Sequence, residues 1–172
     1  MAGIIVYASN YGSTRQYAEW IHEETGFQMY QSKDRAIPWA ESAVVVIGSP
    51  IMAGKPILAK WTQKMWSRMK DATVVFYTTS QTPPTEQVLQ EGFRSTFPEK
   101  MVSAMKYFPL HGKMTYANLG GLHKMMMRIG VLIEKDPAIK KQMMVPVDGV
   151  NRGNVEEIVR YIRGIQESPP SN

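Results

Sequence analysis

The sequence predicts an α/β fold in which a parallel sheet lies between layers of helices. Apolar runs rich in Ile and Val recur at residues 3–8, 43–48 and 73–79, and such runs are typical of strands buried on both faces. Segments with helical spacing separate these runs, and regular alternation of strands and helices implies βαβ units. The length of 172 residues predicts a single domain over residues 1–172.

The individual elements follow from local patterns. After the first strand, residues 9–14 form a turn-rich loop, and residues 15–25 form a helix with an apolar face and Gly26 as its C-terminal cap. Residues 27–31 predict a short second strand. Pro56 is expected to open the helix that follows the strand at 43–48, because proline is tolerated in a first helical turn. The remaining predicted elements are a loop at 49–55, a fourth strand at 73–79, a loop at 80–84, a helix at 85–104, a fifth strand at 104–110 and a last helix around 155–165.

The composition excludes several chemistries. The chain contains no cysteine, so it has no disulfide, thiolate nucleophile or cysteine-ligated metal cluster, and a redox function requires a bound cofactor. No His and carboxylate cluster has the spacing of a metal site, so none is expected. The N-terminal run reads as a strand and not as a signal peptide, and the lack of cysteine is compatible with a reducing compartment. We therefore expect a cytoplasmic protein.

The loop after the first strand carries the clearest chemical signal. Ser9, Asn10, Gly12, Ser13 and Thr14 lie between a buried strand and a helix, where backbone N–H groups and the helix dipole favour a phosphate. The loop matches neither the Walker A nor the GxGxxG pattern, and it contains no lysine, so a monophosphate fits better than a triphosphate. The simpler alternative is that Ser13 and Thr14 only cap the helix.

The pattern Ile-Val-Tyr-Ala-Ser-x-x-Gly-x-Thr at residues 5–14 resembles the FMN phosphate loop of the flavodoxin-like family. Residues 45–55 are similar to the second flavin-contacting loop of that family. Together with the run at 107–113, they look like the flavodoxin-domain branch typified by the menaquinone-dependent protoporphyrinogen oxidase. The resemblance implies a flavodoxin-like three-layer sandwich, a five-stranded parallel sheet of order 2-1-3-4-5, and FMN as the cofactor.

The resemblance also implies which residues contact FMN. The phosphate would be held by Ser9, Asn10, Gly12, Ser13 and Thr14, and Tyr11 would contact the ribityl chain or the ring. One face of the flavin would be lined by Ser49, Pro50, Ile51, Met52, Ala53 and Gly54. The polar edge of the ring would be contacted by Thr79, Ser80, Gln81 and Thr82. A generic strand-to-helix turn is the alternative for residues 49–54.

These loops differ from those of many flavodoxins. Residues 49–55 and 78–84 contain no aromatic residue, so we expect either that the flavin is held more loosely or that one of its faces is open to a partner or substrate. They also contain no Asp or Glu. Two unit charges about 4 Å apart interact with an energy of about 4 kcal/mol at an effective dielectric constant of about 20. We therefore expect reduced flavin to be less destabilised here than beside acidic loops, which suits an oxidase or reductase better than a low-potential carrier.

The chain contains three histidines that could take part in acid–base chemistry. His111 follows the fifth predicted strand at the ligand end of the sheet, and its near-neutral pKa range suits proton transfer, although a solvated loop histidine is the commoner case. His22 and His123 are expected at surface or structural positions. No other residue of these loops is an evident catalyst.

The positive charge is concentrated in an insertion at about 111–145. Residues 94–144 contain nine Lys or Arg, three Asp or Glu and eight of the 13 Met. Residues 119–135 predict an amphipathic helix with Leu122, Met126, Ile129 and Ile133 on one side. Three interpretations stay open: packing on the sheet, peripheral contact with an anionic membrane at its inner face, and recognition of acidic groups on a ligand or partner protein. Nucleic acid is not expected, because no stacking aromatics accompany the basic residues.

Three functions are compatible with these features. The first is an FMN-dependent oxidoreductase acting on a porphyrinogen-like substrate with a quinone acceptor, and the second is a non-enzymatic FMN carrier for a redox partner protein. The third is a flavin-free binding module of the same fold. The oligomeric state is left open.

Overall fold

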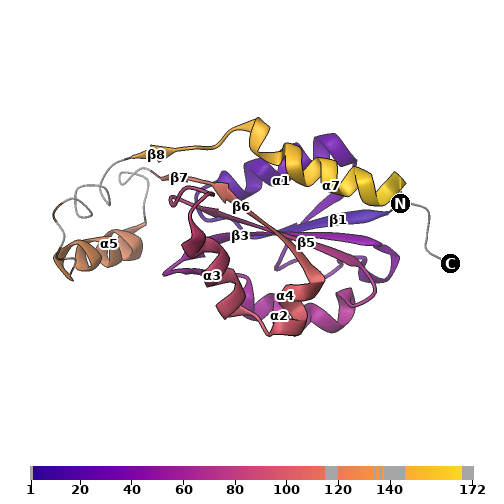
Figure 1. Ribbon diagram of the computed structural model, residues 1–172, viewed down its shortest axis with the longest axis horizontal. Coiled ribbons are helices and arrows are strands. Elements are labelled where there is room, and N and C mark those ends of the chain that lie inside the picture. Colours follow the sequence, from indigo (N-terminus) through magenta and orange to yellow (C-terminus); the bar gives the residue numbers. More distant parts are fainter. Residues whose placement is uncertain (1, 115–119, 134, 136, 138–145, 168–172) are drawn as a thin grey trace.

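The sheet contains five parallel strands in the order β2-β1-β3-β5-β6, as the computed structural model shows (Figure 1). The structure describes residues 2–114, 120–133, 135, 137 and 146–167. With the short β4 left aside, this is the predicted order 2-1-3-4-5. The strands of the sheet are β1 (Gly3–Tyr7), β2 (Gln28–Gln31), β3 (Val44–Met52), β4 (Lys55–Pro56), β5 (Thr73–Ser80) and β6 (Met105–His111).

Helices cover both faces of the sheet. On one face α1 (Ser13–Thr25) and α7 (Glu156–Glu167) bury a cluster that includes Tyr17, Ile21 and Ile158. On the other face lie α2 (Ala59–Met69), α3 (Gln87–Thr96) and α4 (Glu99–Ala104). Short 3-10 turns at Trp39–Glu41 and Arg152–Val155 precede β3 and α7. The predicted three-layer arrangement is confirmed (Figure 1).

Apolar residues on consecutive positions explain why the central strands lie inside. Ile5, Val46 and Val75 face α1 and α7, whereas Ile4, Val45 and Val74 face the opposite helices, and each is at most 3% exposed. Successive side chains of a strand point to opposite faces, so an uninterrupted apolar run buries both. The pairs Ile5–Val46 and Val46–Val75 are in register, which stacks β-branched side chains across the sheet.

The predicted loop at 49–55 is wrong, because β3 continues to Met52 and turns back as a hairpin. Ile51 pairs with Pro56, and Met52 pairs with Lys55, in antiparallel register. Ala53 and Gly54 form the turn with φ values of 48° and 77°, as a two-residue hairpin turn requires. Pro56 therefore belongs to β4 and does not open a helix, and α2 begins at Ala59.

The single helix predicted over 85–104 is also wrong. Phe97 is extended, with φ −114° and ψ 151°, and it separates α3 from α4. The ring of Pro98 disfavours helical geometry at the residue before it, so the chain must stop one helix and start another here. Phe97 then turns into the core and is 5% exposed.

The insertion between β6 and α7 leaves the body on a pair of short strands. These are β7 (Lys113–Met114) and β8 (Val147–Asp148), which pair with each other. Between them, α5 (Gly121–Ile133) confirms a helix within the predicted span 119–135. Figure 1 shows α5 beyond the carboxyl edge of the sheet and apart from it, so the interpretation that this helix packs on the sheet is wrong. The predicted positions Leu122 and Met126 belong to this helix, but their side chains lie outside the described part, as does that of His123.

Candidate functional site

The predicted ligand loops meet at the carboxyl edge of the sheet. Asn10 Nδ2 contacts Met52 Sδ at 3.0 Å, which joins the loop after β1 to the hairpin after β3. The Thr14 and Thr79 hydroxyls are 2.8 Å apart, which joins α1 to the end of β5. In doubly wound sheets, ligands bind in the crevice outside these strand ends. The structure therefore brings together residues that are far apart in the sequence at the expected place.

The loop at residues 9–14 leaves the start of α1 open. Gly12 is the residue before the helix, with φ 92°, and among the described residues no side chain caps the helix at its N-terminus. The Gly12 N–H donates to Ser9 Oγ at 3.1 Å, so the Ser9 hydroxyl shapes the turn. Asn10 and Gly12 are exposed, and Tyr11 is 40% exposed. An uncapped first turn presents unsatisfied N–H groups and the positive end of the helix dipole to an anion.

Buried hydroxyl groups hold this loop on the sheet. Thr14 and Thr79 are 1% and 4% exposed, and the two hydroxyls bond each other. The phenol of Tyr77 donates to the Thr14 carbonyl oxygen at 2.8 Å. Complete burial raises the pKa of Tyr77 well above its ordinary value, so the phenol stays protonated as a donor. The Thr14 and Thr79 hydroxyls thus position the loop from within the fold, and any contact of theirs with FMN stays a prediction.

Replacing Thr14 with valine is expected to lower the free energy of unfolding by about 2 kcal/mol, because the Thr79 hydroxyl is then buried without its partner. The decrease in the free energy of unfolding is expected to be smaller for the double variant Thr14→Val/Thr79→Val than the sum of the decreases for the two single variants. Urea unfolding followed by circular dichroism measures the difference.

Thr62 provides the matched control for these threonine-to-valine variants. It is fully buried, and its hydroxyl has no hydrogen-bond partner among the described residues. Thr62→Val should therefore be neutral or stabilising. Equal losses for Thr14→Val and Thr62→Val would contradict a stabilising bond between Thr14 and Thr79.

The end of β3 divides the predicted flavin-facing residues into two groups. Ser49 is fully buried, and its hydroxyl accepts from the Leu58 N–H and donates to the Pro50 carbonyl. Its side chain therefore connects the hairpin to α2 inside the fold. Ala53 and Gly54 are exposed at the hairpin tip, with Pro50, Ile51 and Met52 half-buried beside it. The hairpin, and not the Ser49 hydroxyl, is available to a ligand.

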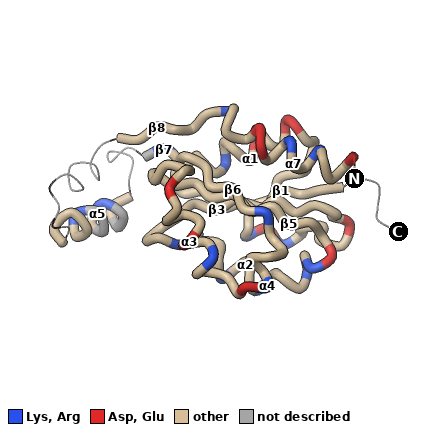
Figure 2. Tube along the Cα trace, viewed as in Figure 1, with Lys and Arg blue, Asp and Glu red and all other residues tan. Residues whose placement is uncertain are grey.

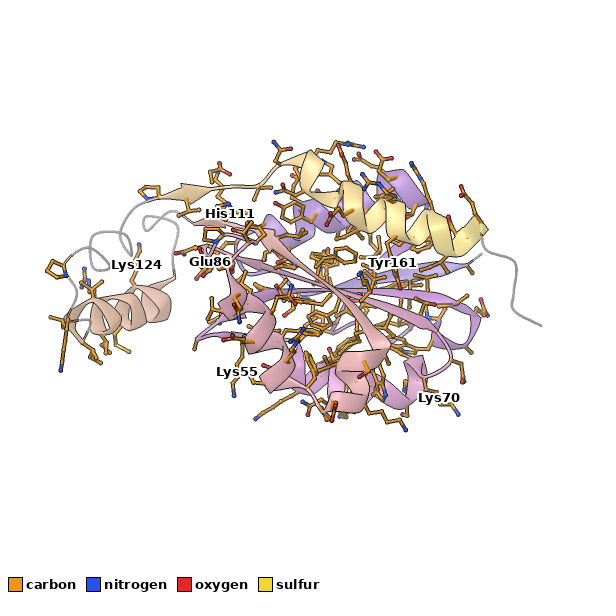
Figure 3. The ribbon with its side chains drawn as sticks, in the orientation of Figure 1. Lys55, Lys70, Glu86, His111, Lys124 and Tyr161 are labelled. Atoms are coloured by element: carbon orange, nitrogen blue, oxygen red, sulfur yellow. The ribbon has the colours of Figure 1, made fainter. Side chains whose placement is uncertain are left out.

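The loop after β5 is fastened to the start of the insertion. Ser80 Oγ donates to the Thr82 carbonyl at 3.0 Å, and the Ser80 carbonyl accepts from the Gly112 N–H at 2.6 Å. His111 Nε2 lies 3.0 Å from the Gln81 carbonyl oxygen and can donate to it. Figure 3 shows His111 at the same end of the molecule as Lys124 on α5, and Lys70 at the opposite end. This contact supports a role for His111 in holding the loop, and proton transfer by its ring stays a prediction.

Lys113 was not predicted to belong to the site. Its backbone N–H donates to Ser13 Oγ at 3.0 Å, and its ammonium group pairs with Asp148 at 2.7 Å. Lys113 therefore lies next to the start of α1, and its charge holds the pKa of Asp148 below the ordinary value. The available signal was its position directly after the fifth strand, where a lysine meets the ligand edge.

Tyr17, which is buried on α1, is a second residue near this edge that was not predicted to belong to the site. Its phenol donates to the His111 carbonyl at 2.6 Å and accepts from Asn154 Nδ2 at 2.7 Å. Burial raises the pKa of Tyr17, which keeps the phenol proton in place. Tyr17 thus connects α1, the end of β6 and the 3-10 turn before α7, and its phenol lies 3.4 Å from the Gly149 carbonyl at the return end of the insertion.

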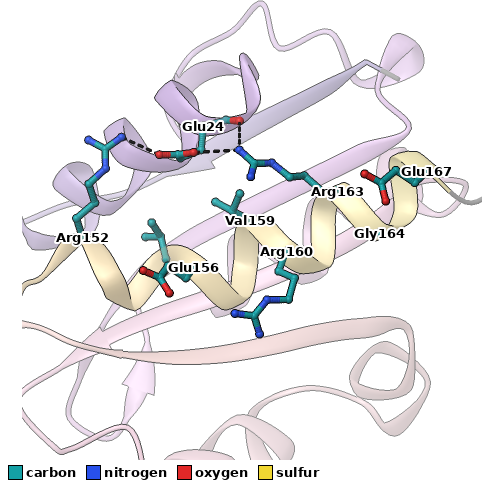
Figure 4. Close-up of a pocket in the computed structure, with 9 residues that line it drawn as sticks. Glu24, Arg152, Glu156, Val159, Arg160, Arg163, Gly164 and Glu167 are labelled. Atoms are coloured by element: carbon teal, nitrogen blue, oxygen red, sulfur yellow. Dashed lines mark hydrogen bonds and ion pairs between the residues drawn. The ribbon is translucent and has the colours of Figure 1, made fainter.

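A hollow of about 650 Å³ lies elsewhere, along α7 (Figure 4). Glu24 on α1 bridges Arg152 and Arg163 at 2.9 and 3.0 Å, and the two guanidinium groups hold its pKa below the ordinary value. Three Arg and three Glu line this hollow, so their charges balance, and none of the predicted site residues belongs to it. Among the described residues, no group of His, Asp and Glu could hold a metal ion, and no helix in this part of the chain is long and apolar enough to cross a membrane.

The fold and the site define a doubly wound α/β protein with a glycine-led helix start at the carboxyl edge of its sheet. Residues 4–140 match the family model described as the flavodoxin domain. This match covers most of the chain, and the chain belongs to the flavodoxin domain family. A comparison with curated protein sequences finds no match.

Solved structures are similar to this chain at low sequence identity. The rubredoxin oxygen:oxidoreductase of the anaerobe Desulfovibrio gigas is 14% identical with a TM-score of 0.50, over 97% of this chain and 37% of that one. A flavoprotein from Lactobacillus acidophilus in complex with FMN is 17% identical with a TM-score of 0.48, over 64% of this chain and 91% of that one. A Bacteroides eggerthii flavoprotein has 15% identity and a TM-score of 0.49, over 78% of this chain and 99% of that one. At such identities the likeness concerns the fold alone.

Proposed function

We propose that this chain is an FMN-binding oxidoreductase that transfers electrons at the carboxyl edge of its sheet. The observation that carries the proposal is the uncapped, glycine-led start of α1 directly after β1. Membership of the flavodoxin domain family and the FMN complex of a protein of similar fold support flavin as the ligand class.

The residues at this edge fit a phosphate. Nothing lies within 4 Å of the position that a side chain at Gly12 would take, and φ 92° at this residue favours glycine. The Ser13 hydroxyl accepts from the Lys113 N–H, which leaves its own proton to donate to an anion. In the proposed complex the phosphate lies at the first turn of α1, with Ser9, Asn10 and Ser13 around it.

The hairpin and the loop after β5 then enclose the ring. The positive φ values at Ala53 and Gly54 expose backbone at the hairpin tip, and Met52 offers a polarisable thioether beside it. When bound, FMN supplies the capacity to store and pass electrons, and the protein orients it and sets its electrostatics. Here the chain supplies backbone and hydroxyl groups and no acidic side chain from 49–55 or 78–84.

We further propose that the flavin exchanges electrons with a small molecule, either a quinone or a porphyrinogen-like ring, and not with a redox partner protein. The support is the absence of aromatic residues from 49–55 and 78–84, which leaves a flavin face uncovered for a flat apolar molecule. Steady oxidation of a porphyrinogen, with its electrons passed to a quinone that is reduced, is the expected result. Rapid exchange with a redox protein and no turnover with a quinone or a porphyrinogen would favour the carrier instead.

Replacing Asn10 with aspartate is expected to weaken FMN binding about tenfold or more. The new carboxylate would lie beside the first turn of α1, where it repels the phosphate and competes for the helix dipole. The exposed contact of Asn10 with a thioether is weak, so its loss should leave the free energy of unfolding nearly unchanged. Titration of the purified protein with FMN, followed by quenching of flavin fluorescence, measures the affinity.

Riboflavin and a matched variant separate the possible causes. Riboflavin carries the same ring without phosphate, so its affinity should change little in Asn10→Asp. Gln28→Glu makes the same amide-to-carboxylate change at an exposed position at the start of β2, the opposite end of the sheet, and it should leave both affinities unchanged. Equal weakening of FMN and riboflavin, or no weakening of either, would show that the phosphate binds elsewhere. Wild-type protein that takes up no flavin would refute the proposed function itself.

A further inference from the structure

We propose that α5 binds the surface of an anionic lipid bilayer. Exposed apolar side chains gather on this helix: it carries four of the seven exposed large hydrophobic residues among those described. Met125 is 53% exposed, Ile129 46%, Leu132 79% and Ile133 72%. A cluster of this kind on one element marks an interaction surface.

The four residues lie on one side of the helix. Their spacing from Met125 is i, i+4, i+7 and i+8, which defines an apolar stripe on a 3.6-residue helix. Figure 1 shows α5 standing apart from the two helical layers, so the body of the protein does not cover the stripe. An apolar stripe at this location suits a partner from outside the domain.

The charge on and around α5 indicates an anionic partner. Residues 121–133 contain Lys124 and Arg128 and no Asp or Glu, and residues 120–141 contain five Lys or Arg against two Asp or Glu. Figure 2 shows the basic positions on α5, and Arg128 is exposed. Two copies of this helix packed together would bring like charges close. A lipid surface with anionic head groups instead accepts the apolar stripe and the cations at the same time.

The length of α5 fits a helix that lies in the plane of the interface. Thirteen residues rise about 20 Å, whereas the hydrocarbon core is about 30 Å thick. The paired strands β7 and β8 join the helix to the carboxyl edge of the sheet. Docking of α5 would therefore place this edge, and not the opposite one, nearest the lipid.

Flotation of the full chain with vesicles tests the proposal. We expect binding to phosphatidylcholine vesicles that contain about 30% phosphatidylserine, clearly weaker binding to phosphatidylcholine alone, and release at high salt because screening weakens exposed charges. Leu132→Glu should lower the partition coefficient at least about tenfold, because it places a charge in the apolar stripe. Arg128→Gln should lower it about fivefold.

Matched variants on the body of the domain serve as controls. Val88 on α3 is 60% exposed, so Val88→Glu repeats the apolar-to-acid change away from α5. Arg160→Gln repeats the charge change on α7, where Arg160 is exposed. Neither control should alter vesicle binding, and circular dichroism should show that all variants are folded.

Three outcomes would overturn the proposal. The first is wild-type protein that does not float with anionic vesicles at low salt. The second is a loss of binding that is equal for Leu132→Glu and Val88→Glu. The third is a concentration-dependent dimer that Leu132→Glu abolishes, which would show that a second copy covers the stripe. The vesicle assay requires no flavin, so its result is independent of the proposed function, and an FMN titration of Leu132→Glu should match that of the wild type.

Discussion

Replacing Gly48 with alanine should lower the free energy of unfolding by about 3 kcal/mol and weaken flavin binding at the same time. Gly48 is buried in β3, and a methyl group there would overlap the ring of Tyr77 on the neighbouring strand. Tyr77 is itself fully buried, and its hydroxyl holds the Thr14 carbonyl. The ring cannot move aside without breaking this bond, so overpacking is costly, and the start of α1 should shift with it.

Chemical denaturation and FMN titration together measure both effects of Gly48→Ala. Gly164→Ala in α7 is the matched control, because a methyl group there meets nothing within 4 Å, and alanine in a helix interior stabilises by about 1 kcal/mol relative to glycine. A Gly48→Ala protein as stable as the wild type would show that the Tyr77 ring has room to adjust.

Phe93→Ala should lower the free energy of unfolding by about 4 kcal/mol, which is typical of deleting a buried aromatic side chain. Phe93 is 3% exposed and stacks on Tyr107 with ring centroids 4.0 Å apart. It also contacts Phe76 and Phe97 at 5.4 and 5.1 Å between centroids. The deletion leaves a cavity in the middle of this cluster, between α3 and the sheet.

Val88 offers the comparison within the same helix. Because it is 60% exposed, Val88→Ala should change stability by no more than about 0.5 kcal/mol. Thermal and urea unfolding measure both variants. If Phe93→Ala lowered the free energy of unfolding as little as Val88→Ala does, the aromatic cluster would not contribute to holding α3 on the sheet.

The predictable parts of the fold are those in which residues adjacent in the sequence determine the local structure. The apolar runs containing Ile5, Val46 and Val75 predict buried strands because both faces of a covered parallel sheet need apolar side chains. Gly26 was a predictable end for α1, and it caps the helix with φ 72°. The apolar spacing of Ile158 and Ile162 likewise predicts the last helix.

The errors arose where a local signal was ambiguous or was outweighed. The turn at Ala53 and Gly54 lacks the Asn-Gly or Asp-Gly pair that usually identifies a two-residue hairpin turn, so Pro56 suggested a helix start instead. At Phe97 the signal was present, because Pro98 restricts the residue before it. The prediction nevertheless placed one continuous helix over this segment of mixed composition, residues 85–104.

The site shows a different limit. A serine after a buried strand is compatible both with binding a ligand and with bonding to its own fold, and Ser49 does the latter by accepting from the Leu58 N–H. The contact of Lys113 with Ser13 joins residues 100 positions apart. Periodicity likewise identifies the apolar side of α5, but it does not reveal whether another element covers it.

The way in which the insertion joins the body has an evolutionary consequence. The chain leaves at Gly112 and returns at Gly149, where the Gly149 N–H donates to the Gly112 carbonyl at 3.1 Å. Since exit and return are adjacent, a change in the length of the intervening segment leaves every strand register of the parallel sheet unaltered. Natural selection can therefore lengthen, shorten or exchange this segment while the parallel sheet is inherited unchanged.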